Sequence, residues 1–283
     1  MTGTAEIAVT GATGALGGRV ARRLAERGIA QRLVVRDPSR APELAEAEVV
    51  TGEYSDGEAM RRALDGVRTW FMVSGTEAYD RLEQHKVAVD AAVAAGVERV
   101  VYTSFLAAAP DATFTFARDH YHTEQHLGDA ELSVVSLRDS IYTDFVPYFA
   151  VDGVIRGPAG DGQVAPVTRD DIADVAVAAL LDPKYDGTTF DLTGPELITM
   201  DEIAELLTEL TGRLVRYEAE TLEQAYASRA NYGAPDWEVA GWVTTYAAIA
   251  AGELAVVADT VESVTGRPAT APRDFLRTAL ASP

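Results

Sequence analysis

The chain has 283 residues, enough for one large α/β domain with an appended lobe or for two modest domains, and its 47% hydrophobic content is ordinary for a globular protein. With 44 acidic against 24 basic residues its formal charge is −20, so its surface repels phosphate backbones and we expect no nucleic-acid partner. It has no cysteine, no N-terminal signal pattern and no apolar run of membrane-spanning length, so we expect no disulfide, no membrane partner and a cytoplasmic location.

Strand-like and helix-like segments alternate through the first two-thirds of the chain. Short apolar runs predict strands at 7–10, 32–35, 48–51, 69–73, 100–103 and 132–137. Helical periodicity and stop signals predict helices at 16–27, from a capping box of Ser55 and Glu58 to before Gly66, at 79–95 and at 119–127. The alternation predicts an α/β fold with a doubly wound parallel Rossmann sheet.

The pattern loosens after Tyr142. Residues 153–162 are rich in Gly and Pro and predict a loop, and 189–192 predict a strand that returns to the sheet. Two helices are predicted from their start and stop signals: Thr168 with Asp171 before Leu181, and Thr199 with Glu202 before Gly212. The remainder is predicted to be a smaller, mostly helical lobe that carries unevenly spaced aromatic residues.

Three glycines separate the first predicted strand from the first predicted helix. Gly11 allows a tight turn, Gly14 lets the backbone approach a pyrophosphate, and Gly17 lets the helix pack close to the strand. The free N–H groups of the helix N-terminus favour an anion. This strand–loop–helix context predicts a dinucleotide site, and the alternative is a glycine-rich turn without a ligand.

The end of the second predicted strand indicates which dinucleotide is bound. An NAD-selective fold usually places a carboxylate there, whereas this chain has Arg36, with Ser39 and Arg40 close behind. Guanidinium groups suit the 2′-phosphate, so NADP(H) is the predicted cofactor. Two alternatives remain at this stage: the arginines are solvated loop residues, or Asp37 turns toward the ribose.

Several segments together resemble a known family. They are the glycine turn, Val35-Arg36-Asp37-Pro38, Val101-Tyr102-Thr103-Ser104-Phe105, His120-Tyr121-His122-Thr123-Glu124, Leu137-Arg138 and Asp191-Leu192-Thr193-Gly194-Pro195. In this order they resemble the NmrA-like, atypical short-chain dehydrogenases, and within that family the NADPH-dependent quinone oxidoreductases. The resemblance covers essentially the whole chain, through Thr265-Gly266-Arg267-Pro268 and Phe275.

The resemblance implies an NADP-binding Rossmann domain over 1–150, to which 166–192 returns, and a smaller substrate-side lobe formed by 151–165 and 193–283. It also implies the cofactor contacts: Gly11, Thr13, Gly14, Ala15 and Leu16 at the pyrophosphate, Arg36 and Arg40 at the 2′-phosphate, Val73, Ser74 and Gly75 near the ribose, and Thr103, Ser104 and Phe105 beside the nicotinamide.

The segment that aligns with the usual Tyr-x-x-x-Lys proton relay departs from it. Ordinary short-chain dehydrogenases use the lysine to depress the tyrosine pKa, but this chain has His120 and Glu124, with Tyr121 one position off. The quinone-reductase relatives also have His and Glu there. Residues 138–142 and Asp144 depart from the family pattern at the presumed substrate face, so the substrates of relatives do not transfer directly.

A quinone needs little from the protein beyond placement of two rings, because the anion formed by hydride addition is delocalised. His120 is the candidate proton donor, since imidazole titrates near neutral pH, and the alternative is a structural helix histidine. Tyr142 is a candidate substrate-wall residue or an ordinary core aromatic. His122 and His126 share a helix face without a strong third ligand, so no metal site is expected.

We therefore expect an NADPH-dependent oxidoreductase that transfers hydride to a quinone or a related conjugated carbonyl or aromatic substrate without a Tyr-Lys dyad. One alternative is a non-catalytic, NADP(H)-sensing regulator of the NmrA type. Another is a tailoring reductase or oxygenase acting on an aromatic polyketide. The expected partner is a small aromatic molecule or quinone. A homodimer is one possible assembly.

Overall fold

The computed structural model describes residues 5–281, which form two compact units. The first comprises the described residues up to Ser104 together with Asp119–Arg138 and Arg169–Phe190. The second comprises Phe105–Arg118, Asp139–Thr168 and the described residues from Asp191 onward. The sequence led us to expect a boundary near residue 150. In the structure, Leu106, Ile141 and Val146 already pack in the hydrophobic core of the second unit.

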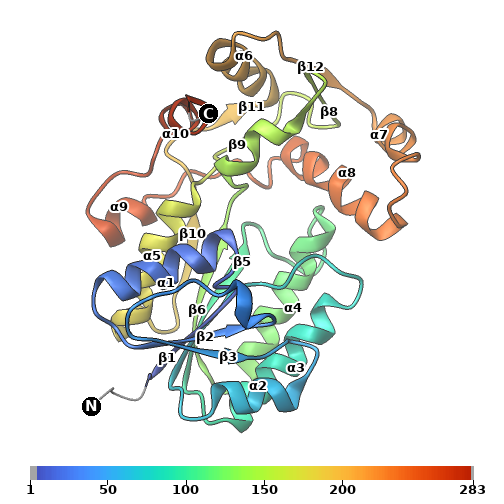
Figure 1. Ribbon diagram of the computed structural model, residues 1–283. Helices are drawn as coiled ribbons and strands as arrows, with labels where there is room; N and C mark the ends of the chain where they lie inside the picture. The colour runs from blue at the N-terminus through green and yellow to red at the C-terminus, as the bar shows by residue number, and fades with distance from the viewer. Residues whose placement is uncertain (1–4, 282–283) are drawn as a thin grey trace. The chain divides into compact units, whose positions relative to one another are not determined.

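A seven-stranded sheet runs in the order β10-β6-β5-β4-β1-β2-β3 (Figure 1). Its strands are β1 (Ile7–Thr10), β2 (Gln31–Val35), β3 (Ala47–Thr51), β4 (Thr69–Met72), β5 (Arg99–Phe105), β6 (Ser133–Asp139) and β10 (Thr189–Leu192). The pairs β3–β2, β2–β1, β1–β4 and β4–β5 are parallel. The strand order reverses between β1 and β4, and in such sheets ligands bind beyond the carboxyl ends of the strands at this switch point.

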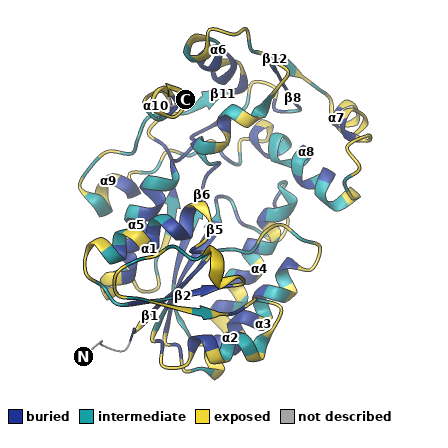
Figure 2. Ribbon diagram, viewed as in Figure 1, coloured by how far each residue is buried: buried dark blue, intermediate teal, exposed yellow. Residues whose placement is uncertain are grey.

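Helices cover both faces of this sheet (Figure 1). On one face α1 (Ala15–Glu26) packs against α5 (Arg169–Leu181). On the other, α2 (Gly57–Leu64), α3 (Arg81–Ala94) and α4 (Thr115–Asp129) share a core with the sheet. The central strands are buried along their length, as Figure 2 shows, which explains their continuous apolar runs.

The start of α2 corrects one sequence prediction. The capping residue is Asp56, whose side chain accepts a hydrogen bond from the Ala59 N–H at 2.9 Å, and not Ser55 in a capping box with Glu58. Helix α4 also begins four residues before the predicted start. By contrast, the capping box of Thr199 and Glu202 is present, since each residue's side chain bonds the other's backbone N–H.

The second unit contains two small sheets. In one, β8 (Val154–Gly157) lies between β12 (Arg216–Ala219) and β7 (Ala150–Val151); in the other, β9 (Gln163–Val164) pairs with β11 (Ile198–Thr199). The prediction of a loop over 153–162 was therefore wrong for β8, which pairs with β12 over four residues despite its closing glycine.

The helices of the second unit pack around a core that includes Ile155, Ile203 and Ile249. They are α6 (Met200–Thr211), α7 (Leu222–Arg229), α8 (Asp236–Ala250), α9 (Thr260–Thr265), α10 (Pro272–Ala281) and the 3₁₀ helix η2 (Thr143–Phe149). Within residues 5–281, no helix is both long enough and apolar enough to cross a membrane.

Candidate functional site

The glycine turn after β1 has the geometry predicted from its sequence. Gly11 adopts φ +68°, a left-handed conformation that favours glycine, and its carbonyl accepts a hydrogen bond from the Gly14 N–H at 2.8 Å. A Cβ added to Gly17 would lie 2.4 Å from the Gly11 oxygen, and one added to Gly14 would lie 3.2 Å from the same atom. The turn is therefore closed tightly against α1, and a side chain at Gly17 would push the two apart.

The N-terminus of α1 is suited to an anion. Its N-cap, Gly14, provides no side-chain cap, and the first helical turn contains no acidic residue. Thr13, Gly14 and Ala15 are exposed, whereas the Leu16 side chain is buried and leaves only its backbone to contact a ligand. N–H groups at a positive helix end that has no side-chain cap fit the pyrophosphate of a dinucleotide.

Thr10 connects the ends of β1 and β4 at the switch point. Its Oγ1 donates to the Phe71 carbonyl at 2.9 Å and accepts from the Val73 N–H at 3.2 Å. Tyr54 adds a second link, because its hydroxyl donates to the Val73 carbonyl at 2.7 Å. A Cβ on Gly11 would meet the Val73 side chain at 3.0 Å, so the glycine turn and the end of β4 are in close contact.

The ends of β4 and β5 are joined by a second set of hydrogen bonds. The Ser74 N–H donates to Thr103 Oγ1 at 2.7 Å, and the Gly75 N–H donates to His85 Nε2 at 2.8 Å. His85 Nδ1 lies 2.9 Å from the Thr123 hydroxyl. The structure thus brings Gly11, Gly14, Val73–Gly75 and Thr103 together at one edge of the sheet.

His85 was not identified from the sequence. The Thr123 hydroxyl donates to the Asp119 carbonyl at 2.7 Å, so it accepts from His85 Nδ1–H, and Nε2 is left to accept from Gly75. Burial, and then the charge of Arg81, lower the pKa of His85 to about 3, so the ring is neutral. No sequence signal marks His85, because its two hydrogen-bond partners, Gly75 and Thr123, lie in two other segments of the chain.

His120, the candidate proton donor, is buried. Its Nδ1 lies 2.9 Å from the Tyr102 hydroxyl, in the interior of the first unit. Burial, and then the charge of Arg81, lower the pKa of His120 well below its ordinary value. Burial disfavours the charged imidazolium and therefore favours the neutral ring, and the role of His120 as a proton donor stays a prediction.

Glu124, the other residue at the proton-relay position, is engaged in an ion pair. The guanidinium of Arg138 donates to both carboxylate oxygens, with Nε–Oε1 at 3.0 Å and Nη2–Oε2 at 2.6 Å. By contrast, the hydroxyl of Ser104 at the end of β5 is buried and has no hydrogen-bond partner among the described residues. Ser104 thus places a buried hydroxyl without a hydrogen-bond partner at the position predicted for the nicotinamide.

The loop after β2 supports the choice of arginines as 2′-phosphate ligands. Asp37 turns back on its own 3₁₀ turn, accepting hydrogen bonds from the Ser39 N–H at 3.0 Å and from the Ser39 hydroxyl at 2.7 Å. These bonds lower the pKa of Asp37 below its ordinary value. The exposed side chains of Arg36 and Arg40 form no hydrogen bond or ion pair within residues 5–281.

Tyr142 and Phe105 belong to the second unit. The Tyr142 hydroxyl donates to Asp139 Oδ2 at 2.9 Å, and its ring stacks on Phe145 with centroids 5.9 Å apart. Phe105 packs against Phe114 at 4.8 Å. Tyr142 is thus a half-buried aromatic with a bonded hydroxyl, and its role as a substrate wall stays a prediction.

Comparison with known proteins gives a consistent result. A family model described as NAD(P)H-binding matches residues 11–183. Quinone oxidoreductase 2 of Escherichia coli is 33% identical over 238 residues, which cover 81% of this chain and 83% of the relative. A (4-alkanoyl-5-oxo-2,5-dihydrofuran-3-yl)methyl phosphate reductase of Streptomyces griseus is 37% identical over 278 residues, covering 95% and 96%.

The fold is shared with a solved relative. The crystal structure of the NADPH-dependent quinone oxidoreductase QOR2 from Escherichia coli, complexed with NADPH, superposes with a TM-score of 0.88 at 29% identity and covers 96% of this chain and 99% of that one. The chain therefore belongs to the NAD(P)H-binding family and is an oxidoreductase of the quinone-oxidoreductase type that uses a nicotinamide coenzyme.

Proposed function

We propose that this protein is an NADPH-dependent reductase of quinones and related conjugated carbonyl compounds. The observation that carries the proposal is the cradle at the switch point: a tight turn closed by Gly11 and Gly14, a helix N-terminus without a side-chain cap, and an unpaired Arg36 beyond the neighbouring strand. The names of two relatives, a quinone reductase and a reductase of an unsaturated furanone phosphate, support electron-poor conjugated acceptors.

Preference for the phosphorylated coenzyme follows from the loop after β2. Arg36 and Arg40 offer guanidinium donors, while the carboxylate of Asp37 is occupied by Ser39 and does not present itself to a ribose hydroxyl. A planar guanidinium can bind a phosphate with two parallel hydrogen bonds. On a chain of charge −20, this local pair of cations favours an anionic group where most of the surface disfavours one.

The chemistry proposed for the site needs no tyrosine–lysine relay. A reduced nicotinamide, when bound, supplies a hydride. The chain's own groups position the rings and exclude water: the backbone of Val73–Gly75 is fixed by Thr103 and His85, and Ser104 leaves one hydroxyl free to orient a polar group. Neutral His120 acts in this proposal as a buried support for Tyr102 and not as a titrating acid.

A substrate panel tests the proposal. NADPH oxidation is followed by absorbance with benzoquinones, naphthoquinones, anthraquinones and α,β-unsaturated lactones, each with NADH in a parallel assay. We expect turnover with at least one quinone class and a strong preference for NADPH. Tight NADPH binding without reduction of any acceptor would contradict the proposed enzyme and favour the alternative of an NADP(H)-sensing regulator.

A further inference from the structure

The second unit contains a cavity of about 610 Å³, lined by η2, β7, β8, α7, α8 and the segment between the two helices. This volume lies within the range of small-molecule sites, roughly 300–1,000 Å³. Five lining side chains are aromatic and two are arginines, and none of those lining it is a carboxylate. We propose that the cavity binds a planar aromatic compound that carries a carboxylate.

Aromatic rings at this cavity are left open to solvent. Tyr148 is 77% exposed and Tyr232 is 62% exposed. Tyr232 also packs against Trp242, with ring centroids 6.2 Å apart and planes inclined by 51°. Large exposed aromatic side chains gathered around one hollow mark a binding surface, and their flat faces favour a flat ligand.

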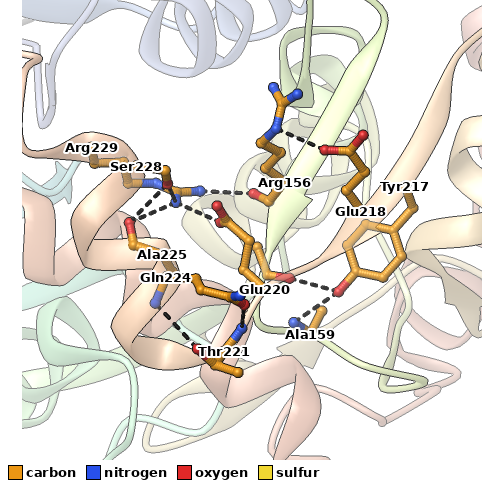
Figure 3. Close-up of polar contacts among 11 residues, drawn as sticks. Arg156, Ala159, Tyr217, Glu218, Glu220, Thr221, Gln224, Ala225, Ser228 and Arg229 are labelled. Atoms are coloured by element: carbon orange, nitrogen blue, oxygen red, sulfur yellow. Dashed lines mark hydrogen bonds and ion pairs between the residues drawn. The ribbon is translucent and has the colours of Figure 1, made fainter.

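The charge at the cavity favours an anionic ligand. Arg156 Nε donates to Glu218 Oε2 at 2.9 Å, as Figure 3 shows, but no residue within 5–281 accepts a hydrogen bond from either of its terminal Nη groups. Both guanidinium groups at the cavity are in ion pairs, Arg156 with Glu218 and Arg229 with Glu220, but neither carboxylate lines the cavity itself. The remaining N–H groups of Arg156 suit a carboxylate, which can accept two hydrogen bonds from one guanidinium.

The walls of the cavity are held in place by internal contacts. Arg229, 8% exposed, connects α7 to β8: its Nη1 donates to Glu220 Oε2 at 2.9 Å and its Nη2 donates to the Arg156 carbonyl at 2.7 Å (Figure 3). The ring of Tyr246 lies directly against Gly157, where an added Cβ would be 2.4 Å from a ring carbon. A site built this way is organised before the ligand arrives, which lowers the entropy lost on binding.

Equilibrium binding to the full chain without coenzyme tests the site. Calorimetric titrations compare anthraquinone-2-carboxylate with its neutral carboxamide, and we expect the carboxylate to bind about tenfold more tightly, the effect of one charge-assisted contact. Arg156→Gln should remove that preference. Arg216→Gln is the matched control, because Arg216 bonds the same Glu218 at 2.7 Å but does not line the cavity.

A second pair of variants tests the aromatic wall. Tyr232→Ala should weaken both probes about fivefold or more through lost stacking, whereas Tyr226→Ala, on α7 outside the cavity lining, should change neither. Equal affinities for the two probes, equal effects of Arg156→Gln and Arg216→Gln, or no binding of either probe would overturn the proposal. So would a change in sedimentation on Tyr232→Ala with unchanged probe binding, which would identify the surface as a contact between copies.

This proposal and the reductase proposal can fail separately. The binding experiment uses no coenzyme and measures no turnover. Loss of probe binding with normal NADPH oxidation would remove the cavity as an aromatic-anion site and leave the enzyme intact. Probe binding without any NADPH oxidation would support the cavity as an aromatic-anion site and contradict the reductase proposal.

Discussion

The glycines of the turn after β1 matter because they have no side chain. Gly17 lies so close to the Gly11 carbonyl that even a methyl group has no space, and Gly14 leaves the end of α1 without a side-chain cap. The same absence that lets the helix approach the strand also leaves backbone N–H groups accessible to an anion. One local geometry therefore serves both packing and coenzyme binding.

Gly17→Ala should separate the turn from α1. The added Cβ would lie 2.4 Å from the Gly11 oxygen, so the backbone must shift, and we expect a loss of about 1–3 kcal/mol in the free energy of unfolding together with weaker NADPH binding. Gly128→Ala is the matched control: Gly128 lies in α4 with no atom near its added Cβ, so stability should stay equal or rise. Denaturant titration and coenzyme titration of both variants give the answer.

His85 gives the site a pH-dependent stability. Its pKa is lowered to about 3 in the folded chain, while the unfolded chain takes up the proton near the ordinary value of 6.5. The unfolded state therefore binds more protons between these values, so stability is full above pH 6.5 and falls as pH decreases toward 3. The contribution of one such group is about 1.4 kcal/mol per pH unit.

His85→Gln tests this dependence, because the glutamine amide oxygen can still accept the Gly75 N–H but does not titrate. We expect the stability of the variant to fall less steeply than that of the native chain between pH 6.5 and pH 4.5, by about 1.4 kcal/mol per unit. Urea midpoints at several pH values measure it. The exposed His122→Gln variant is the control and should keep the native dependence of stability on pH. If His85→Gln also kept it, His85 would not be the group responsible.

Among the helices and strands, the strands of the main sheet were predicted closely, since the central ones are buried on both faces and read as apolar runs. The strand Ile7–Thr10 and the strand Thr189–Leu192 were predicted with their observed bounds. The short strand β8 was missed because Gly and Pro around it also predict loops. His85 and Thr10 were missed for another reason: their partners are distant in sequence and only the fold brings them together.

The start of α2 allows a sharp test between two neighbouring residues. Asp56→Ala removes the carboxylate that accepts the Ala59 N–H, so it should cost about 1 kcal/mol in the free energy of unfolding. Ser55→Ala should be nearly neutral, because Ser55 does not cap this helix. Thermal or urea unfolding measures the stability of both variants. A larger loss for Ser55→Ala than for Asp56→Ala would contradict the observed cap and support the capping box predicted from the sequence.

At the scale of the whole molecule, coenzyme binding has to overcome a formal charge of −20. In the first unit, unpaired cations follow β2 and a positive helix end follows β1, and these two strands are neighbours in the sheet. Most other arginines of the chain are held in ion pairs, such as Arg23 with Asp170 and Asp174. We therefore expect recognition of the phosphorylated coenzyme to depend on the few cations that the fold leaves unpaired.

Calorimetric titration of the coenzyme-free chain with NADPH and NADH tests whether Arg36 selects the phosphorylated coenzyme. We predict that NADPH binds more tightly than NADH, and that Arg36→Ala weakens NADPH binding about 10- to 100-fold, as expected for loss of charge-assisted hydrogen bonds, while NADH affinity changes little. Arg27→Ala, an exposed arginine beyond the end of α1, should leave both affinities unchanged. Equal affinities for the two coenzymes, or no heat with NADPH on folded protein, would contradict the account.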